Sequence, residues 1–458
     1  MSSPTPFHQT TGVKQVFRAL NNRNYRLFFF GQGVSLIGTW MQTIALGWLV
    51  YRITHSPFLL GMVGFAGQLP MLFLTPFAGV LSDRWQRRRV LVVTQCLAML
   101  QALALACLTL TGLIQVWHLM VLAVFLGVVN SFDMPTRQAF TLEMVDRKED
   151  LANAIALNSS VFNASRLIGP TIAGILISLV GEGLCFLFNG VSYIAVVVAL
   201  LSMRLAPPQA PTSEKSLVKD LRVGLRYAFG FLPIRNILLL LALVSLVGMP
   251  YTILMPVFAK DILGGGAHTL GVLMAGTGVG ALVGTIYLAA RNSVVGLGKR
   301  IPLATACLGV GLIGFSFSRH MLFSMPLIAV AGFGMMVSMA ASNTILQTIA
   351  EEDKRGRLMS LYAMAFAGMA PFGSLLAGTL STRIGAPRTL TLGGVVCLVG
   401  AGLFALQLPQ LRALVRPIYN QKGIIHPWCT KSHRENCGQI SPTSEAAIEQ
   451  VGPDRRLR

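Results

Sequence analysis

The chain of 458 residues is divided into twelve long apolar runs, and this division restricts the fold more than any other feature. A helix needs roughly 20 apolar residues to span the hydrocarbon core of a bilayer. The runs that meet this length are 27–50, 58–81, 90–112, 117–138, 152–180, 183–203, 235–258, 269–290, 301–318, 321–345, 357–382 and 387–408. They predict an all-α membrane protein with twelve transmembrane helices and the lipid bilayer as its surroundings.

The composition supports a membrane protein and excludes a nucleic-acid-binding one. Apolar residues make up 53% of the chain and charged residues 12%, whereas a soluble domain is about 25% charged. The net charge of +20 lies in short loops and tails between the runs, not on one face of a soluble domain. We therefore interpret the charge as topogenic.

The positions of the basic residues predict the orientation. If the N-terminus is inside, only five of the 37 Lys and Arg residues lie in outer loops, one lies within a span, and the other 31 lie in inner loops and tails. Such a bias favours both termini in the cytoplasm. We expect a multi-pass protein of the cell membrane, meaning the inner membrane in a cell that has both an inner and an outer membrane.

The middle of the chain separates two halves of six spans. A proline-rich linker begins at Pro207 and continues into a basic segment, 214–230, whose leucines share one helical face, as in a helix that lies on the inner leaflet. The predicted divisions are a cytoplasmic segment 1–26, a first bundle 27–204, a linker 205–233, a second bundle 234–408 and a disordered cytoplasmic tail 409–458.

The halves resemble each other in sequence. Residues 142–181 and 346–385 align at a shift of 204, and Leu60-Gly61 resembles Leu270-Gly271 at a slightly different shift. The alignment matches Gly169 with Gly373, Gly174 with Gly378, and Gly181 with Gly385. A six-span unit used twice is typical of transporters, in which two bundles rock about a central site.

A short loop carries the most specific motif. Residues 79–91 read GVLSDRWQRRRVL and lie between the second and third runs. This stretch resembles the loop 2–3 signature of the major facilitator superfamily, with Gln86 where the family usually has glycine. The matching positions are Gly79, Leu81, Asp83, Arg84, Arg87 and Arg88. The resemblance covers about residues 15–408 and implies two pseudo-symmetric six-helix bundles, working as a monomer.

The resemblance also implies a gate at this loop. Gly79 would let span 11 approach near Gly378, and Asp83 would meet arginines or a helix end. The gating loop then comprises Gly79, Asp83, Arg84, Arg87 and Arg88. The alternative is topogenic charge with a tight turn.

Span 5 is similar to that of exporters within this superfamily. The run RLIGPTIAG at 166–174 looks like their Gly-Pro signature, and 134–174 resembles the branch of enterobactin exporters and macrolide efflux proteins. Proline removes a helical hydrogen bond and bends the helix. We predict a functional bend at Gly169, Pro170 and Gly174, with an ordinary membrane-helix kink as the alternative.

Two charges lie within the spans of the first half. Asp133 is in span 4 and Arg166 is in span 5, at a depth where a charge costs about 2.5–3.5 kcal/mol on the insertion scale. Adjacent helices would let them pair, and the carboxyl would take up a proton when it is separated from the arginine in a dry site. We predict that Asp133 and Arg166 couple proton movement to transport; a permanent structural ion pair is the alternative.

Neutral polar residues within the spans predict a central cavity. The cavity residues that we expect are Gln32, Gln42, Gln68, Asn130, Asn163, Met336, Asn343 and Tyr362. Flexible methionines suit a site for varied lipophilic molecules, although core or lipid packing explains most single methionines. The absence of a mid-span charge in the second half favours amphiphilic or neutral substrates.

Other chemistries find little support. There is no GxxxxGK[ST] loop and no nucleophile elbow, so we predict neither an enzyme nor a cofactor. Four residues in the tail have zinc-ligand chemistry at a spacing that is not standard, and we expect no metal there. They are His426, Cys429, His433 and Cys437.

The sequence therefore predicts a secondary transporter, coupled to protons, that exports a small amphiphile such as a drug, a macrolide-like compound or a siderophore. Two alternatives remain open. One is uptake of a nutrient or lysolipid by the same fold, and the other is a membrane receptor or scaffold that transports nothing.

Overall fold

The structure is a computed structural model, and it contains twelve helical spans in its described part. The described residues are 17–141, 143–145, 150–204, 225–291, 293–352 and 354–424, without the side chains of residues 76, 79–84 and 152. Twelve helices in these ranges are long and apolar enough to cross a membrane. The predicted number of spans and the all-α class are confirmed.

The first bundle consists of six long helices. They are α2 (Arg23–Thr54), α3 (Pro57–Arg84), α4 (Arg87–Leu110), α5 (Val116–Phe140), α6 (Leu151–Val180) and α7 (Glu182–Ser202), preceded by a short turn of helix, η1 (Arg18–Asn21). Within it α3 packs on α5, α4 packs on α7, and α2 packs on both α6 and α7.

The second bundle has six spans, two of which are interrupted. Span 7 is built from α9 (Leu232–Leu243), η3 (Val244–Gly248), α10 (Tyr251–Val257) and η4 (Phe258–Ile262), and both η segments are π-helical. The others are α11 (Ala267–Ala289), α12 (Leu297–Phe317), α13 (Met321–Ile349), the pair α14 (Arg355–Ala367) and α15 (Ala370–Ile384), and α16 (Ala386–Gln421). Short π-helical segments are frequent at functional sites.

The outer surface of the bundles is apolar, as lipid requires. Leu322 and Leu406 are 80% and 79% exposed, and Leu179 is 75% exposed. A soluble protein rarely exposes large apolar surfaces, so these side chains fit a hydrocarbon surrounding.

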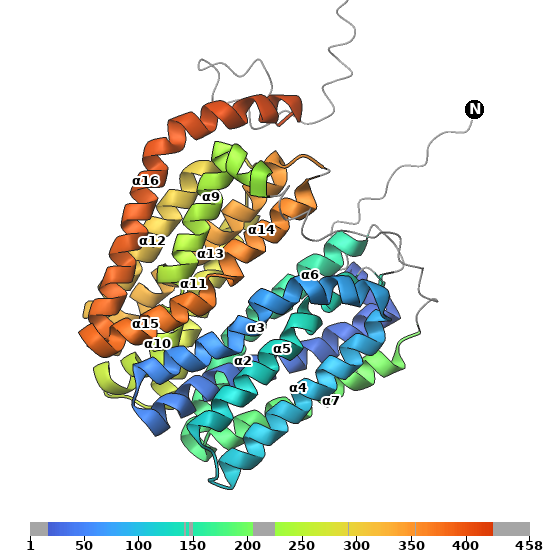
Figure 1. The fold of residues 1–458 in the computed structure, drawn as a ribbon, viewed down its shortest axis with the longest axis vertical. Helices are drawn as coiled ribbons and strands as arrows, with labels where there is room; N and C mark the ends of the chain where they lie inside the picture. The colour runs from blue at the N-terminus through green and yellow to red at the C-terminus, as the bar shows by residue number, and fades with distance from the viewer. Residues whose placement is uncertain are drawn as a thin grey trace, which may run out of the picture.

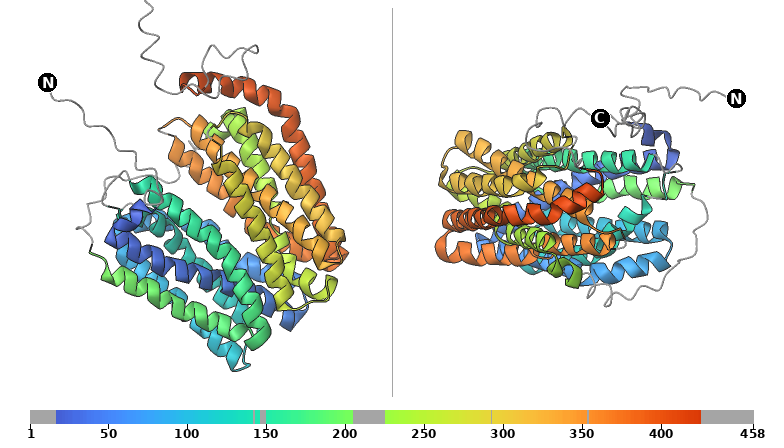
Figure 2. Two further views of the ribbon diagram at one scale, coloured as in Figure 1. Left: turned by 180° about the vertical axis from the view of Figure 1, so that it is seen from behind. Right: turned by 90° about the horizontal axis from the view of Figure 1, so that it is seen from above.

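The two bundles lie side by side and splay apart at one face. Figure 1 shows helices α2–α7 as one group and α9–α16 as another, and Figure 2 shows the same separation from behind. We call the face with η1 and the end of α16 the terminal face, and the face with the turns at 55–56 and 263–266 the opposite face. The bundles converge toward the opposite face, where α3 packs on α15 and α6 packs on α11.

The structure repeats the same turn in both halves. Gly181 joins α6 to α7 with φ +85° and ψ 174°, and Gly385 joins α15 to α16 with φ +85° and ψ 153°. An L-residue rarely adopts this φ, so glycine is required at both turns. The alignment of these two glycines in sequence corresponds to a shared backbone conformation.

The last helix is longer than we predicted. We placed the end of the second bundle at residue 408 and a disordered tail after it, but α16 continues to Gln421. Leu411 and Tyr419 are buried in the second bundle, with Val415 and Ile418 packed beside them, so this segment has an apolar face that stabilises the helix. Figure 1 shows this last part of α16 lying across the end of its bundle.

Two other predicted segments are covered only in part. Of the linker, residues 205–224 lie outside the described residues, and residues 225–230 are helical. The rest of the tail, with its four histidines and cysteines at 426–437, also lies outside the described residues.

Candidate functional site

Two glycine pairs bring the bundles into contact near the opposite face. A Cβ built on Gly61 of α3 would lie 2.9 Å from the Cα of Gly378 in α15, and one built on Gly174 of α6 would lie 2.9 Å from the Cα of Gly271 in α11. The sequence repeat matched Gly61 with Gly271 and Gly174 with Gly378. Each contact therefore contains one copy of each repeated glycine, as expected where two related halves meet about a pseudo-twofold axis.

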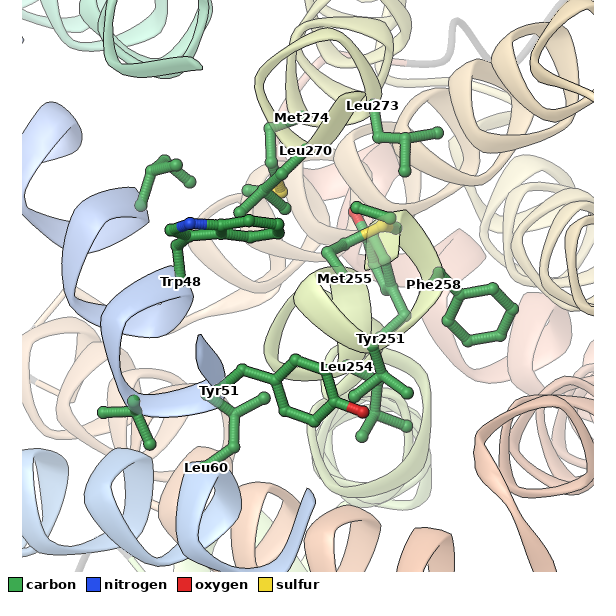
Figure 3. Packing of buried hydrophobic residues seen from close by; sticks show 14 of the residues in the cluster. Trp48, Tyr51, Leu60, Tyr251, Leu254, Met255, Phe258, Leu270, Leu273 and Met274 are labelled. Carbon is green, nitrogen blue, oxygen red and sulfur yellow. The ribbon is translucent and has the colours of Figure 1, made fainter. Parts of the chain in front are cut away.

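A buried apolar cluster closes the boundary at the same face. It includes Trp48 of α2, Leu60 of α3, Leu254 of α10, and Leu270 and Met274 of α11. Figure 3 shows the Trp48 ring directed toward Leu270 and Met274, so side chains from both bundles share one core. Burial of this surface favours the closed arrangement of the opposite face.

Polar contacts cross the boundary at its edge. The hydroxyl of Tyr51 at the end of α2 donates a hydrogen bond to the carboxylate of Asp261 in η4. The Nζ of Lys260 lies 3.5 Å from the Nε2 of His55. These four residues were not predicted, and no spacing in the sequence relates 51–55 to 260–261.

A small hollow lies between the bundles, toward the middle of the spans. It is partly open and is lined by Gln68, Ser245, Met249, Pro250, Thr252, Ile253, Ala370 and Ser374. The Nε2 of Gln68 lies 3.4 Å from the Oγ of Ser374 across the boundary. Among the predicted cavity residues, Gln68 is thus located between the bundles.

Arg166 lies near the boundary and contacts an aromatic ring. Its guanidinium carbon is 5.8 Å from the ring centroid of Trp40 on α2, and that ring makes an edge contact with Phe162, also at 5.8 Å between centroids. The next residue, Leu167, lies against Gly278 of α11. Arg166 is therefore in the part of α6 that meets the second bundle.

A buried tyrosine of the second bundle comes close to this arginine. Tyr251 in α10 is 1% exposed, and within the described residues its hydroxyl has no hydrogen-bond partner of normal geometry. It lies next to the Thr277 side chain and within electrostatic reach of Arg166. Figure 3 shows the Tyr251 ring pointing toward α11, the helix that carries Leu273 and Met274.

Asp133 pairs with a different arginine from the one we predicted. It is 2% exposed, and its carboxylate accepts hydrogen bonds from Thr94 at 2.9 Å and Gln95 at 2.7 Å, both on α4. Its ion-pair partner is Arg137, one turn later on α5, and not Arg166. An arginine four residues away on the same helix reaches the carboxylate without crossing to another helix. A role of Asp133 or Arg166 in proton coupling stays a prediction.

Two members of the predicted gating loop have described side chains, and both contact the first bundle. Arg87 forms an ion pair with Glu143 at 2.7 Å, and Arg88 donates a hydrogen bond to the carbonyl of Leu201 at 2.6 Å. Nothing is described for the side chains of the other predicted members, Gly79, Asp83 and Arg84. The gating role therefore remains a prediction.

The predicted partner of Gly79 is elsewhere. Gly378 packs on Gly61 and the carbonyl of Pro57, at the beginning of α3, whereas Gly79 is close to its end. Helix α15 runs toward the opposite face, so in this structure Gly378 lies away from the loop at the terminal face.

The glycines of the Gly-Pro run pack closely against neighbouring helices, while the functional bend stays a prediction. Pro170 lies inside an uninterrupted α6. A Cβ on Gly169 would lie 2.5 Å from the Cβ of Trp40, and Gly174 contacts Gly271. Helix α6 is thus held against α2 on one side and against α11 on the other.

Several predicted cavity residues are engaged within one bundle. Gln42 hydrogen-bonds Gln101 and Asn189, both at 2.9 Å, inside the first bundle, which contradicts its assignment to the cavity because its amide is already satisfied there. Tyr362 donates to the carbonyl of Met339 at 3.2 Å within the second bundle.

The remaining members of that set vary in burial. Gln32 is buried, and its Oε1 has no hydrogen-bond partner within the described residues. Four others are half-buried, and these are Asn130, Asn163, Met336 and Asn343. Asn163 bonds the Ser159 carbonyl of its own helix, so its position indicates no specific ligand.

Comparison with known proteins gives a family match over most of the chain. A family model described as "Transmembrane secretion effector" matches residues 15–426. The chain is 25% identical over 371 residues to the Staphyloferrin A transporter of Staphylococcus aureus, covering 81% of this chain and 92% of that protein. It is 27% identical over 397 residues to the multidrug efflux pump Tap of Mycolicibacterium fortuitum, covering 85% and 96%.

Solved structures share the fold at low sequence identity. A bacterial homolog of the human lysosomal transporter Spinster, in an inward-facing and unoccupied conformation, superposes with a TM-score of 0.66 at 13% identity, covering 88% of this chain and 99% of that one. A POT family transporter in complex with a thioalcohol-conjugated peptide gives 0.67 at 13% identity, covering 85% and 96%.

Proposed function

The chain belongs to the transmembrane secretion effector family of major facilitator transporters, and from this membership we propose that it exports a small amphiphilic compound in exchange for protons. It is a membrane transporter of small molecules and not an enzyme. The direction of transport, the coupling ion and the substrate are the proposed parts.

One observation supports alternating access most strongly. The bundles are held together at the opposite face by the two glycine pairs and the shared apolar core, while they splay apart at the terminal face. With both termini in the cytoplasm, as the basic residues favour, this is a carrier open to the inside. It would receive its substrate from the cytoplasm or the inner leaflet.

The lining of the boundary favours an amphiphile. Trp40, Phe162 and Phe372 supply aromatic surface, while Gln68 and Ser374 supply a few neutral polar groups. Pockets of mainly apolar walls with few polar groups suit lipophilic ligands.

The buried carboxylate of Asp133 supports proton coupling. It is held by three donors in the interior of the first bundle, and an intramembrane carboxylate is a recurrent element of proton relays. A movement of α4 relative to α5 that withdraws the Thr94 and Gln95 donors would favour uptake of a proton.

Everted membrane vesicles test this function. With radiolabelled erythromycin and an acid interior, wild-type vesicles should accumulate more of the drug than vesicles that lack the protein, and an uncoupler should abolish this excess. Asp133→Asn should remove the dependence on the pH gradient while keeping exchange of labelled for unlabelled drug. The double variant Asp133→Asn, Arg137→Gln serves if the single variant folds poorly, since it leaves no unpaired charge.

Glu182→Gln is the matched control. Glu182 is also a buried acid paired with an arginine, Arg52, but it lies at the opposite face. This variant should keep gradient-driven accumulation. Full gradient dependence in both Asp133 variants would contradict the coupling role, and accumulation in right-side-out but not in everted vesicles would indicate uptake in place of export.

A further inference from the structure

Arg166 carries a charge that no acid among the described residues balances. Within the described residues no carboxylate lies at ion-pair distance from its guanidinium, whereas the acids at the other buried sites, Asp133 and Glu182, each have an arginine. The guanidinium of Arg166 lies over the Trp40 ring. An uncompensated cation within a span is costly and marks a functional position.

The surroundings of Arg166 are suited to an anion on an apolar body. Tyr251 is 1% exposed and lies within electrostatic reach of the arginine, and within the described residues its hydroxyl has no hydrogen-bond partner of normal geometry. The neighbouring Thr277 donates its own hydroxyl to the carbonyl of Leu273. Trp40 and Phe162 offer ring surfaces in edge contact with each other. A cation, the Tyr251 hydroxyl and aromatic surfaces therefore come from α2, α6 and α10.

The location favours a ligand over a structural charge. The arginine side chain belongs to the first bundle and the tyrosine to the second, so a group that binds both of them contacts both halves. A ligand held in this way can change the relative stability of two bundle arrangements, because the arrangement that brings the two groups together binds it more tightly.

We propose that Arg166 binds a carboxylate of the transported molecule, with Tyr251 as a second donor and with Trp40 and Phe162 against its aromatic or apolar part. This rests on the proposed function as a transporter and names anionic amphiphiles as the preferred substrates within the broader class of amphiphiles. Arginine suits the task because its planar donors match the two oxygens of a carboxylate.

A matched pair of probes tests the charge. Anthracene-9-carboxylate and anthracene-9-carboxamide share one ring system and differ in charge at pH 7. Their affinities for the full chain in lipid nanodiscs can be measured by equilibrium dialysis. Because charge-assisted hydrogen bonds are the strong ones, the wild-type protein should bind the carboxylate about tenfold or more tightly than the amide.

Three variants assign that preference to Arg166. Arg166→Gln should bring the two affinities within about twofold of each other, and Arg166→Lys should retain a preference for the carboxylate because it keeps the charge. Arg300→Gln is the control, since Arg300 lies 5.2 Å over the ring of Tyr287 in a comparable contact outside the boundary; it should leave the preference unchanged.

Three results would overturn the proposal. These are equal affinities in the wild-type protein, a preference that persists in Arg166→Gln, and saturable binding of neither probe. The vesicle assay separates this outcome from failure of the transport function. Gradient-driven accumulation of erythromycin without a carboxylate preference leaves export standing and removes the anion site. If the protein instead transports nothing but shows a carboxylate preference that Arg166→Gln abolishes, the anion site stands and the transport function is contradicted.

Discussion

Replacing Gly61 by alanine should open the opposite face. The added Cβ would lie 2.5 Å from the backbone oxygen of Ser374 and 2.9 Å from the Cα of Gly378. Ordinary contact begins near 3.4 Å, so α3 and α15 must separate by about 0.9 Å to accommodate a methyl group. Both obstacles are backbone atoms, which cannot rotate away.

The energy follows from the size of this clash. Overpacking of a tight contact costs roughly 1–3 kcal/mol. The cost applies to the arrangement in which the opposite face is closed and disappears when the bundles separate there. The equilibrium between the two arrangements should therefore shift toward the open one by about 5- to 150-fold.

Gly402→Ala is the control for helix propensity. Alanine stabilises a helix interior by about 1 kcal/mol relative to glycine in any arrangement. Gly402 is in α16, and a Cβ built there has no neighbour within 4 Å. This variant should change the overall stability without changing the equilibrium between the two arrangements.

Spin labels at the opposite face report the equilibrium. Leu113 and Leu322 are 65% and 80% exposed near this face, one in each bundle. Labelled cysteines at these positions, in a chain whose seven native cysteines are replaced by alanine, should give a longer distance distribution in Gly61→Ala than in the parent or in Gly402→Ala. An unchanged distribution would refute the idea that the glycine contact keeps this face closed.

Two further substitutions test contacts that the sequence alone did not reveal. Arg137→Gln leaves the carboxylate of Asp133 buried without its cation, so the purified protein should lose about 3–5 kcal/mol of stability and unfold at a lower temperature. Adding Asp133→Asn to the same chain should recover part of the loss. Equal melting temperatures of the parent and Arg137→Gln would contradict the pairing. Tyr51→Phe removes the hydrogen bond to Asp261 across the boundary and should destabilise the closed arrangement by about 1 kcal/mol. The same spin labels should then show a larger population at the long distance. A distance distribution identical to the parent's would show that this bond does not contribute.

The number and arrangement of the spans could be predicted because lipid permits few alternatives. Bilayer thickness fixes the length of an apolar run, and the basic loops divide the runs into two halves. The repeat of Gly174 and Gly378 was also visible, since a position that allows no Cβ keeps its glycine in both copies. Which glycines touch was not visible, because it depends on the direction in which α3 and α15 run.

The contacts of charged side chains were less predictable. Asp133 was assigned to Arg166 on a neighbouring helix, although Arg137 is four residues later and the i, i+4 spacing was a usable signal. The site around Tyr251 and Thr277 had no signal, since isolated tyrosines and threonines are frequent in membrane helices. Their significance comes from the approach of α10 and α11 to α6.

The end of α16 was predicted wrongly for a local reason. The polar composition of residues 409–458 suggested a disordered tail. However, Leu411, Val415 and Ile418 recur at spacings of four and three, which is the pattern of a helix with one apolar face. The second bundle buries this face.

A reversible cross-link between the bundles tests the central claim most directly. The Cβ of Ser374 lies 3.4 Å from a Cβ built on Gly64, close to the separation of about 3.5–4.5 Å in a disulfide. Gly67 and Ala123 have the same 3.4 Å separation, but both lie in the first bundle, so a cysteine pair there is the matched control.

We predict that Gly64→Cys, Ser374→Cys in the cysteine-free chain loses the protein-dependent accumulation of erythromycin in everted vesicles when oxidised and recovers it on reduction. Oxidised Gly67→Cys, Ala123→Cys should continue to transport. Transport at the full rate by the oxidised pair between the bundles, with the cross-link verified on the same vesicles, would contradict alternating access about this boundary.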